Sequence, residues 1–302
     1  MLIVAIARGG GKCLAHREKI QPPLGGLPML LYHFAIDYAM KTGASPGYAE
    51  QLRVLTKRLP WQVSELTVAN IDGYLTQALH SLAPQTVQNH RRMLITLRRA
   101  ALRGNLLVDD CTGEVRRVKC PRPLPRAWSH EEIRRLIQAA GEMPGGTQTC
   151  RWKILLPAWI LVAYSSGLRL GDMLTLRHDS IRGAKVALVM AKTGRPHVVM
   201  LDGAALQAIA SLPISGPLVF GGLVGRCVLI RAFRRLVKRA GMAGSGRLLR
   251  RSSATYAAIA GMNPSDHLGH MTPGLAQRCY VDPVLVAELK NPVPSVALAV
   301  DP

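Results

Sequence analysis

The sequence predicts a mainly α-helical protein of two domains, with one small β-hairpin or sheet in the second domain. Three observations support this prediction. The chain has 302 residues, which is enough for two ordinary hydrophobic cores. Apolar residues recur at helical spacing along most of the chain. Prolines and basic residues gather in residues 109–126, and this change of composition indicates a linker between the domains.

The first part of the chain is predicted to be a helical domain behind a loose arm. Residues 1–27 are rich in glycine and proline and are expected to form the arm, and residues 28–108 the domain. Helical patterns cover residues 30–40, a segment beginning at Pro46, residues 67–79 and residues 84–102. The last of these is the longest and, with the linker, is rich in arginine. A solvated face is the plain interpretation, but we expect these arginines to lie along a phosphate backbone: Arg91, Arg92, Arg98, Arg99, Arg116 and Arg117.

The second domain is predicted to cover residues 127–290, followed by a tail at 291–302. Ser129 and Glu132 form a capping box that predicts the start of a helix. Residues 185–190 and 197–201 alternate like two strands around a Thr-Gly-Arg-Pro turn. Helices are expected at 152–165, 170–176, 203–211, 227–240, 252–260 and 274–279. The apolar residues after position 281 are expected either to cap their own domain or to dock on a neighbouring protomer.

The charge of the chain favours a polyanionic partner. Lysine and arginine number 39 against 18 acidic residues, which gives a formal charge of +21. Charge alone leaves a ribosome-associated or merely basic protein open, and aromatic residues at 5% do not favour a platform for stacking single strands. Six scattered cysteines without a Cys-x-x-Cys pair indicate free thiols in a reducing cytosol. We expect a cytoplasmic protein without a membrane partner.

Four short motifs in the second domain carry the candidate chemistry. Arg169 lies in Ser-Gly-Leu-Arg-Leu-Gly-Asp, Lys192 lies between the two predicted strands, and Arg250 follows them. His270 closes Leu-Gly-His, and Tyr280 comes ten residues later. Two guanidinium groups, an ammonium and an imidazole can bind one phosphate, and a phenol beside them can attack it. Asp172, three residues after Arg169, is expected to orient that arginine, and the set includes no metal site.

The order and spacing of these motifs resemble the catalytic domain of the tyrosine recombinases, the phage-integrase family. By this resemblance Tyr280 is the nucleophile, His270 and the two arginines stabilise the phosphate, and Lys192 is the general acid, with Lys185 as its rival. One position departs from the family pattern, because Arg247 stands where the family usually has a histidine. Arginine does not act as a base in proteins, but Arg247 can bind phosphate as a third guanidinium, and placement on the surface is the alternative. We therefore expect His270 alone among the motif residues to titrate near neutrality, at about 6.5.

The resemblance implies a bacterial or phage-derived protein, and with it a function, a fold and partners. The function is a site-specific DNA recombinase or integrase of a mobile element that works through a 3′-phosphotyrosyl intermediate, without cofactor, metal or ATP. The fold is an integrase-like, two-domain clamp around double-stranded DNA, and the assembly is a homotetramer that synapses two sites. Two alternatives remain, DNA relaxation by a type IB topoisomerase-like enzyme and a DNA-binding protein that has lost cleavage.

Overall fold

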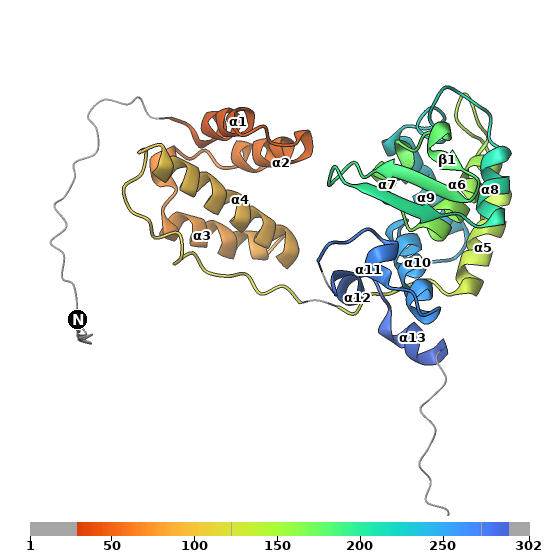
Figure 1. Ribbon diagram of the computed structural model, residues 1–302. Helices are drawn as coiled ribbons and strands as arrows, with labels where there is room; N and C mark the ends of the chain where they lie inside the picture. The colour runs from red at the N-terminus through yellow and green to blue at the C-terminus, as the bar shows by residue number, and fades with distance from the viewer. Residues whose placement is uncertain (1–28, 122, 273, 290–302) are drawn as a thin grey trace, which may run out of the picture. The chain divides into compact units, whose positions relative to one another are not determined.

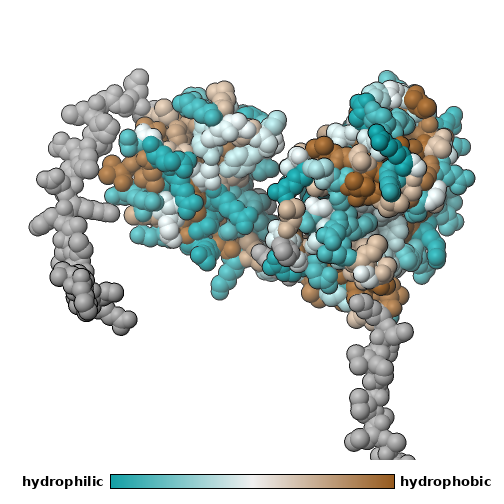
Figure 2. Space-filling model, in the orientation of Figure 1, coloured by the Kyte–Doolittle hydropathy of each residue, from teal (hydrophilic) through white to brown (hydrophobic). Residues whose placement is uncertain are grey.

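The computed structural model describes residues 29–121, 123–272 and 274–289. The chain divides into two compact units, residues 1–122 and 123–302, each with its own hydrophobic core. The described residues are mostly helical with one small sheet, which confirms the predicted fold class (Figure 1). No helix in these ranges is long and apolar enough to cross a membrane. Hydrophilic residues cover much of the visible face of each unit (Figure 2).

The first unit is a set of helices whose starts follow from local sequence. Ser45 accepts a hydrogen bond from the backbone N–H of Tyr48 and Pro46 fills the first helical position, so a helix begins there. Thr67 caps the third helix in the same way. The elements are α1 (Leu31–Lys41), α2 (Pro46–Lys57), the 3₁₀ turn η1 (Val63–Glu65), α3 (Val68–Leu79) and α4 (Pro84–Arg103). Helix α1 packs on α2 and α4, and α3 packs on α4.

The segment after α4 contributes to this first core. Val115 and Val118 are buried among the leucines of the helices, although the sequence suggests an extended linker over residues 109–126. Arg91 on α4 holds the same segment, because its guanidinium donates to the carbonyl oxygens of Val115 at 2.7 Å and of Arg116 at 2.6 Å. The first compact unit therefore extends beyond residue 108, where the first domain was expected to end, and the boundary between the units lies at residues 122 and 123.

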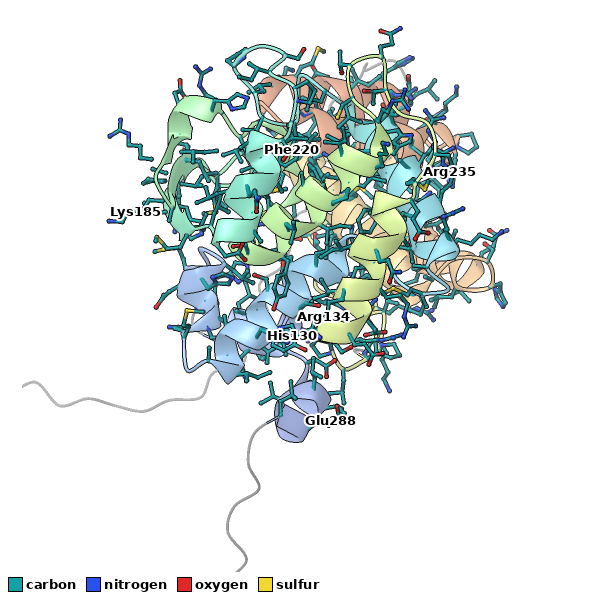
Figure 3. The ribbon with its side chains drawn as sticks, turned by 90° about the vertical axis from the view of Figure 1, so that its right-hand side faces the viewer. His130, Arg134, Lys185, Phe220, Arg235 and Glu288 are labelled. Atoms are coloured by element: carbon teal, nitrogen blue, oxygen red, sulfur yellow. The ribbon has the colours of Figure 1, made fainter. Side chains whose placement is uncertain are left out.

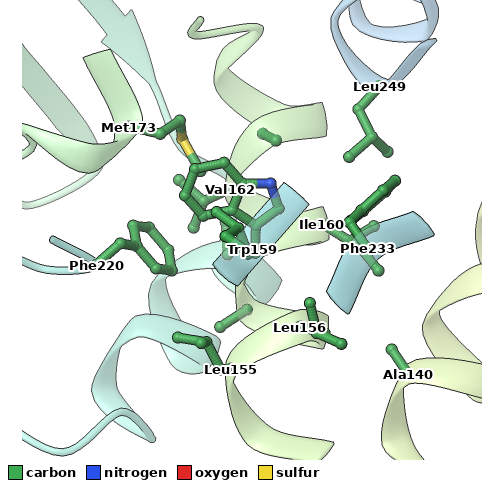
Figure 4. Packing of buried hydrophobic residues seen from close by; sticks show 14 of the residues in the cluster. Ala140, Leu155, Leu156, Trp159, Ile160, Val162, Met173, Phe220, Phe233 and Leu249 are labelled. Atoms are coloured by element: carbon green, nitrogen blue, oxygen red, sulfur yellow. The ribbon is translucent and has the colours of Figure 1, made fainter. Parts of the chain in front are cut away.

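The second unit is built around an apolar helix, α6. Its residues are buried on most sides, as expected for a helix that is hydrophobic all round. Trp159 on α6 meets Phe220 edge to face, with ring centroids 5.0 Å apart (Figure 4). The helices are α5 (His130–Gly141), α6 (Trp152–Ser166), α7 (Leu170–Leu174), α8 (Gly203–Ala210), α9 (Arg226–Arg239), α10 (Arg247–Ile259), α11 (Pro264–His267), α12 (Leu275–Cys279) and α13 (Pro283–Leu289). Helices α5, α8 and α10 pack on α6.

The sheet of the second unit is antiparallel, in the order β1-β2-β3. Its strands are β1 (Ile181–Arg182), β2 (Lys185–Val189) and β3 (Pro196–Met200), with the 3₁₀ turn η2 (His178–Ser180) before them. Val186 pairs with Val199 and Leu188 with His197 across the β2–β3 hairpin. The predicted strands are present, and the short strand β1 adds to them.

Two helices differ from the sequence prediction. Helix α10 begins at Arg247 and not near residue 252, because Leu248 and Leu249 are buried and make its arginine-rich start part of the packed helix. Helix α13 follows Asp282, whose carboxylate accepts hydrogen bonds from the N–H groups of Val284 and Leu285. It packs on α10. The described part of the C-terminal segment thus packs on its own unit.

Candidate active site

Arg169 lies at the end of a sharp turn that closes α6. Gly167 takes a left-handed conformation there, with φ of 60°. A β-carbon on this glycine would lie 2.7 Å from Leu268 Cδ2 and 3.0 Å from Ser253 Oγ, so only glycine fits. The turn thereby comes against α10 and the Leu-Gly-His segment. Arg169 follows as the residue that begins α7.

Asp172 connects α7 to the β2–β3 hairpin. Its carboxylate is 1% exposed, and Oδ1 accepts a hydrogen bond of 2.8 Å from the backbone N–H of Ala191. Oδ2 has no hydrogen-bond partner among the described residues and lies 3.9 Å from Arg169 Nη1. The same Nη1 lies 3.3 Å from Met190 Sδ. The pair expected from the i, i+3 spacing is therefore present as a long ion pair, and both residues also contact the hairpin.

Arg250 lies at the centre of the cluster. It is 7% exposed, and its guanidinium donates to the carbonyl oxygen of Gly167 and, at 3.0 Å, to that of Leu268. A third contact of 3.1 Å joins Nη2 to His270 Nε2, while Nε has no partner among the described residues. Burial, followed by the charge of Arg169, lowers the pKa of Arg250 to about 10. The group is still a cation at neutral pH, with a free donor.

His270 differs from its expected titration. Burial, followed by the positive charges of Arg250 and Arg169, lowers the pKa of His270 to about 4. The expectation of an ordinary value of about 6.5 is therefore wrong for this histidine. Because a guanidinium only donates, Nε2 is the acceptor and the neutral ring carries its proton on Nδ1. Nδ1 is buried and has no hydrogen-bond partner in the described part of the chain.

Tyr280 lies beside both of these groups. Its ring centroid is 5.0 Å from that of His270 and 5.3 Å from Arg250 Cζ, a distance typical of a cation–π contact. The tyrosine ends α12, where its N–H donates to Ala276 O at 2.8 Å. Two residues on, the N–H of Asp282 donates to Thr255 Oγ1 at 2.9 Å. Helix α10, which carries Arg250, thus also holds the segment that follows the tyrosine.

The buried carboxylate of Asp282 also fixes the point at which the chain enters the second unit. Its Oδ2 accepts a hydrogen bond of 2.8 Å from the N–H of Ala127. Trp128 is fully buried, and its N–H donates to Ser252 Oγ at 2.8 Å. The start of the second unit is therefore hydrogen-bonded to α10 and to the residues after Tyr280.

Lys192 and Arg247 lie outside these direct contacts. Lys192 is exposed in the β2–β3 turn, and its charge contributes to the lowered pKa of His270. Lys185 lies at the other end of β2, where it pairs with Met200 (Figure 3). Arg247 is exposed in the first turn of α10, one turn before Arg250. Of the two lysines, only Lys192 is in the turn that Asp172 holds next to the arginines.

Two further histidines lie beside the cluster: sequence reasoning did not single out His197, and it considered His267 only as a zinc ligand with His270 and Cys279, which it rejected. His197 on β3 is half-buried against Gly269, and His267 shares a 2.6 Å hydrogen bond with Ser253 Oγ. The local sequences Pro-His-Val and Asp-His-Leu give no signal that would distinguish these histidines from ordinary polar residues. Only tertiary contacts bring them to the site. In the described ranges no three His, Cys, Asp or Glu side chains are grouped so that they can hold a metal ion.

The predicted DNA-binding arginines of the first unit are not equivalent. Arg98 is 5% exposed and donates to the carbonyl oxygens of Leu66 and, at 2.5 Å, Asp109. The prediction of a phosphate contact is wrong for this residue, because its guanidinium satisfies buried backbone acceptors. Arg91 is also engaged with backbone, as described above. The exposed members of the set are Arg92, Arg99, Arg116 and Arg117.

A second basic face, which the sequence reasoning did not single out, lies on α9. Its exposed cations recur at helical spacing, and the helix contains no acidic residue. They are Arg231, Arg234, Arg235, Lys238 and Arg239 (Figure 3 labels Arg235). The opposite face of α9 packs into the core through Leu229, Phe233 and Leu236.

The comparisons with known proteins confirm the resemblance to the tyrosine recombinases. Tyrosine recombinase XerD of Caulobacter vibrioides is 26% identical over 188 residues, which cover 61% of this chain and 60% of that protein. Tyrosine recombinase XerC of Xylella fastidiosa is 31% identical over 152 residues, 47% of this chain and 49% of that protein. The chain thus spans about half to three-fifths of the length of these relatives. No protein-family model matches it.

Solved structures give the same fold. A lambda integrase dimer bound to a COC′ core site has a TM-score of 0.67 at 16% identity, over 81% of this chain and 96% of that chain. A lambda integrase tetramer bound to a Holliday junction has a TM-score of 0.64 at 15% identity, over 80% of this chain and 76% of that one. The fold class of this chain, mostly helical with a small three-stranded sheet, therefore matches that of the integrase catalytic domain.

Proposed function

We propose that this chain is a site-specific recombinase that cuts and rejoins double-stranded DNA through Tyr280. The observation that carries the proposal is the convergence of Arg169, Arg250, His270 and Tyr280 on one small region of the second unit. The likeness to XerC, XerD and lambda integrase supports the same reaction. By likeness to the bacterial recombinases XerD and XerC, the proposed location is on DNA in the cytoplasm of a bacterium.

The proposed reaction is one exchange at phosphorus. The Tyr280 oxygen forms a bond to the phosphorus of the scissile phosphate, and the bond from phosphorus to the 5′-oxygen breaks. The phenol gives its proton to water as it attacks, and the 5′-oxygen gains one from Lys192, so the leaving group is an alcohol and not an alkoxide. The energy of the broken ester is kept in the phosphotyrosine, and attack by the 5′-hydroxyl of a partner duplex reverses the step.

The arginines and His270 hold the charge that develops on the phosphate. Arg250 offers its free Nε–H from a rigid position, because two of its other donors are fixed on carbonyl oxygens. The Nδ1–H of neutral His270 is a second unpaired donor in the described structure. Donors that are already oriented stabilise a transition state without reorganisation, and each is typically worth a factor of ~10²–10³ in rate.

The exposed cations of both units are the proposed contacts to the DNA backbone. Arg92, Arg99, Arg116 and Arg117 lie on the first unit, and the α9 cations lie on the second. Cations of this kind neutralise phosphates and release counterions, so binding is expected to weaken steeply with salt. By likeness to the lambda integrase tetramer bound to a Holliday junction, we propose a tetramer that joins two DNA sites.

Covalent capture tests the proposal. A library of random duplexes, each with one 5′-bridging phosphorothiolate in place of a backbone phosphate, is incubated with the protein. Cleavage at the sulfur is irreversible, so the adduct accumulates, survives denaturant and can be sequenced to give the site. We expect adducts with the wild-type chain and none with Tyr280→Phe, which keeps the ring but lacks the nucleophile.

The same experiment separates the alternatives. A chain that binds the library but forms no adduct is a DNA-binding protein without cleavage. A chain that forms the adduct and relaxes supercoiled DNA carrying two recovered sites, yet yields no recombinant product, is a topoisomerase-like enzyme. Adducts formed by Tyr280→Phe would refute Tyr280 as the nucleophile.

A further inference from the structure

His197 makes a close contact with the turn that carries His270. It is the second residue of β3 and pairs with Leu188 across the hairpin. Its Nδ1 lies 3.0 Å, and its Cε1 and Cγ lie 3.1 Å, from the place that a β-carbon on Gly269 would take. Gly269 itself has φ of +65°. The imidazole thus lies on the bare backbone of the residue next to His270, where a larger residue would not fit.

This contact is one of those that hold the turn containing Lys192. The turn is closed by hydrogen bonds of 2.8 Å, from Met190 N to Arg195 O and from Gly194 N to Met190 O. On the β2 side, Asp172 accepts from the N–H of Ala191 at 2.8 Å. On the β3 side, His197 lies two residues beyond Arg195 and rests on Gly269. The first contact fixes the turn to α7, and the second fixes it to the Leu-Gly-His segment.

We propose that His197 is a positioning residue, which holds the Lys192 turn against the turn of Gly269 and His270 so that the lysine and the histidine address the same phosphate. This inference rests on the proposed function, because it assigns His197 a place in protonation of the leaving group. Neither sequence motifs nor the resemblance gives this residue a role.

The charges around His197 favour its neutral form. Burial lowers the pKa of His197, and the guanidiniums of Arg250 and Arg169 lower it further, against the opposing effects of the His267 backbone and the Asp172 carboxylate. The groups that face it are Arg169 and Asp172 from α7, Arg250 from α10, His267 from α11, and His270. Protonation adds a positive charge among these cations, so the contact with Gly269 is expected to weaken as the pH falls below the usual range of a histidine.

The test uses two versions of the site recovered by covalent capture, one with the normal 5′-oxygen and one with the 5′-bridging sulfur. A 5′-thiolate leaves without a proton, so the sulfur substrate does not need Lys192. We expect His197→Ala to slow single-turnover cleavage of the oxygen substrate about 10- to 100-fold, the range in which a misplacement of about 1 Å falls. On the sulfur substrate, His197→Ala should cleave as fast as wild type.

Two further variants sharpen the result. His197→Phe keeps a flat ring on Gly269 without a titrating group, so it should cleave the oxygen substrate at neutral pH like wild type and retain that rate where wild type declines in acid. Val198→Ala is the matched control, because Val198 is the next residue of β3 and is 60% exposed on the opposite face. It should cleave both substrates like wild type.

Four outcomes would overturn the proposal. Equal losses of His197→Ala on both substrates would mean that the residue acts on the attack step or on folding, and wild-type rates on the oxygen substrate would mean that it has no role. A loss in Val198→Ala as large as that in His197→Ala would mean that any weakening of the hairpin has this effect. If wild type forms no adduct with either substrate, the proposed function itself fails and this inference with it.

Discussion

Replacing Arg250 with lysine keeps the positive charge and removes the planar fork. In the structure the guanidinium donates to two backbone carbonyls, those of Gly167 and Leu268, at a site that is 7% exposed. A lysine ammonium on a single stem reaches one of these acceptors in place of both, and a buried carbonyl left unpaired costs about 1–3 kcal/mol. The free energy of unfolding should fall by that amount, which is a fraction of the ~5–15 kcal/mol typical of a folded protein. The variant should therefore still fold.

The rate of cleavage by Arg250→Lys should fall by much more than its loss of folding stability can account for. Loss of an oriented donor to the developing phosphate charge typically costs a factor of ~10²–10³. Urea unfolding measures the stability of each variant. Cleavage is measured as single-turnover adduct formation with the sulfur substrate, without urea, under conditions in which every variant is folded. Arg251→Lys is the matched control, because Arg251 is the next residue and makes no side-chain hydrogen bond in the described structure. Unchanged stability and cleavage in Arg250→Lys, or equal losses in both variants, would refute the assignment of Arg250.

Three other predictions follow from the site. Because the pKa of His270 is lowered to about 4, this residue binds fewer protons in the folded chain than in the unfolded chain between about pH 4 and 6.5. The free energy of unfolding should therefore decline as the pH falls from about 6.5 towards 4. Urea unfolding at a series of pH values should show a smaller decline in His270→Gln. Lys192→Ala should fail to cleave the oxygen substrate but should cleave the sulfur substrate, whereas Lys185→Ala should cleave both like wild type. If Lys185→Ala and not Lys192→Ala shows this rescue by sulfur, Lys185 is the general acid in place of Lys192. Arg247→Ala should leave cleavage of bound DNA intact and lower the salt slope of binding by about one, and a strong loss of cleavage would place Arg247 in the phosphate site.

The parts of the fold that local chemistry determines could be predicted from the sequence. The capping box of Ser129 and Glu132, the proline at the start of α2 and the apolar α6 all form as expected. Helix α10 was predicted to start too late, because three of its first five residues are arginines and its first turn has no side-chain cap. Its start depends on burial of leucines against distant elements, which no local pattern reports.

The candidate site divides in the same way. Arg169, Arg250, His270 and Tyr280 could be singled out because each lies in a motif of defined spacing. The pKa of His270 could not, because it depends on burial and on arginines that are 20 and 101 positions away in the sequence. The burial of Arg98 could not be predicted from the helical pattern either, because the carbonyl groups that accept its hydrogen bonds lie outside its own helix.

The hydrogen bond between Ala127 and Asp282 has a consequence for how the protein can be divided. Asp282 lies two residues after Tyr280, so the peptide at which the chain enters the second unit and the segment that follows the nucleophile share one buried carboxylate. A truncated chain that starts at Ser129, where the first helix of this unit is capped, would lack both Ala127 and the buried Trp128. A catalytic fragment that keeps Tyr280 in place must therefore begin before Ala127, and tension on the chain at that point acts through Asp282 on the segment that follows the nucleophile.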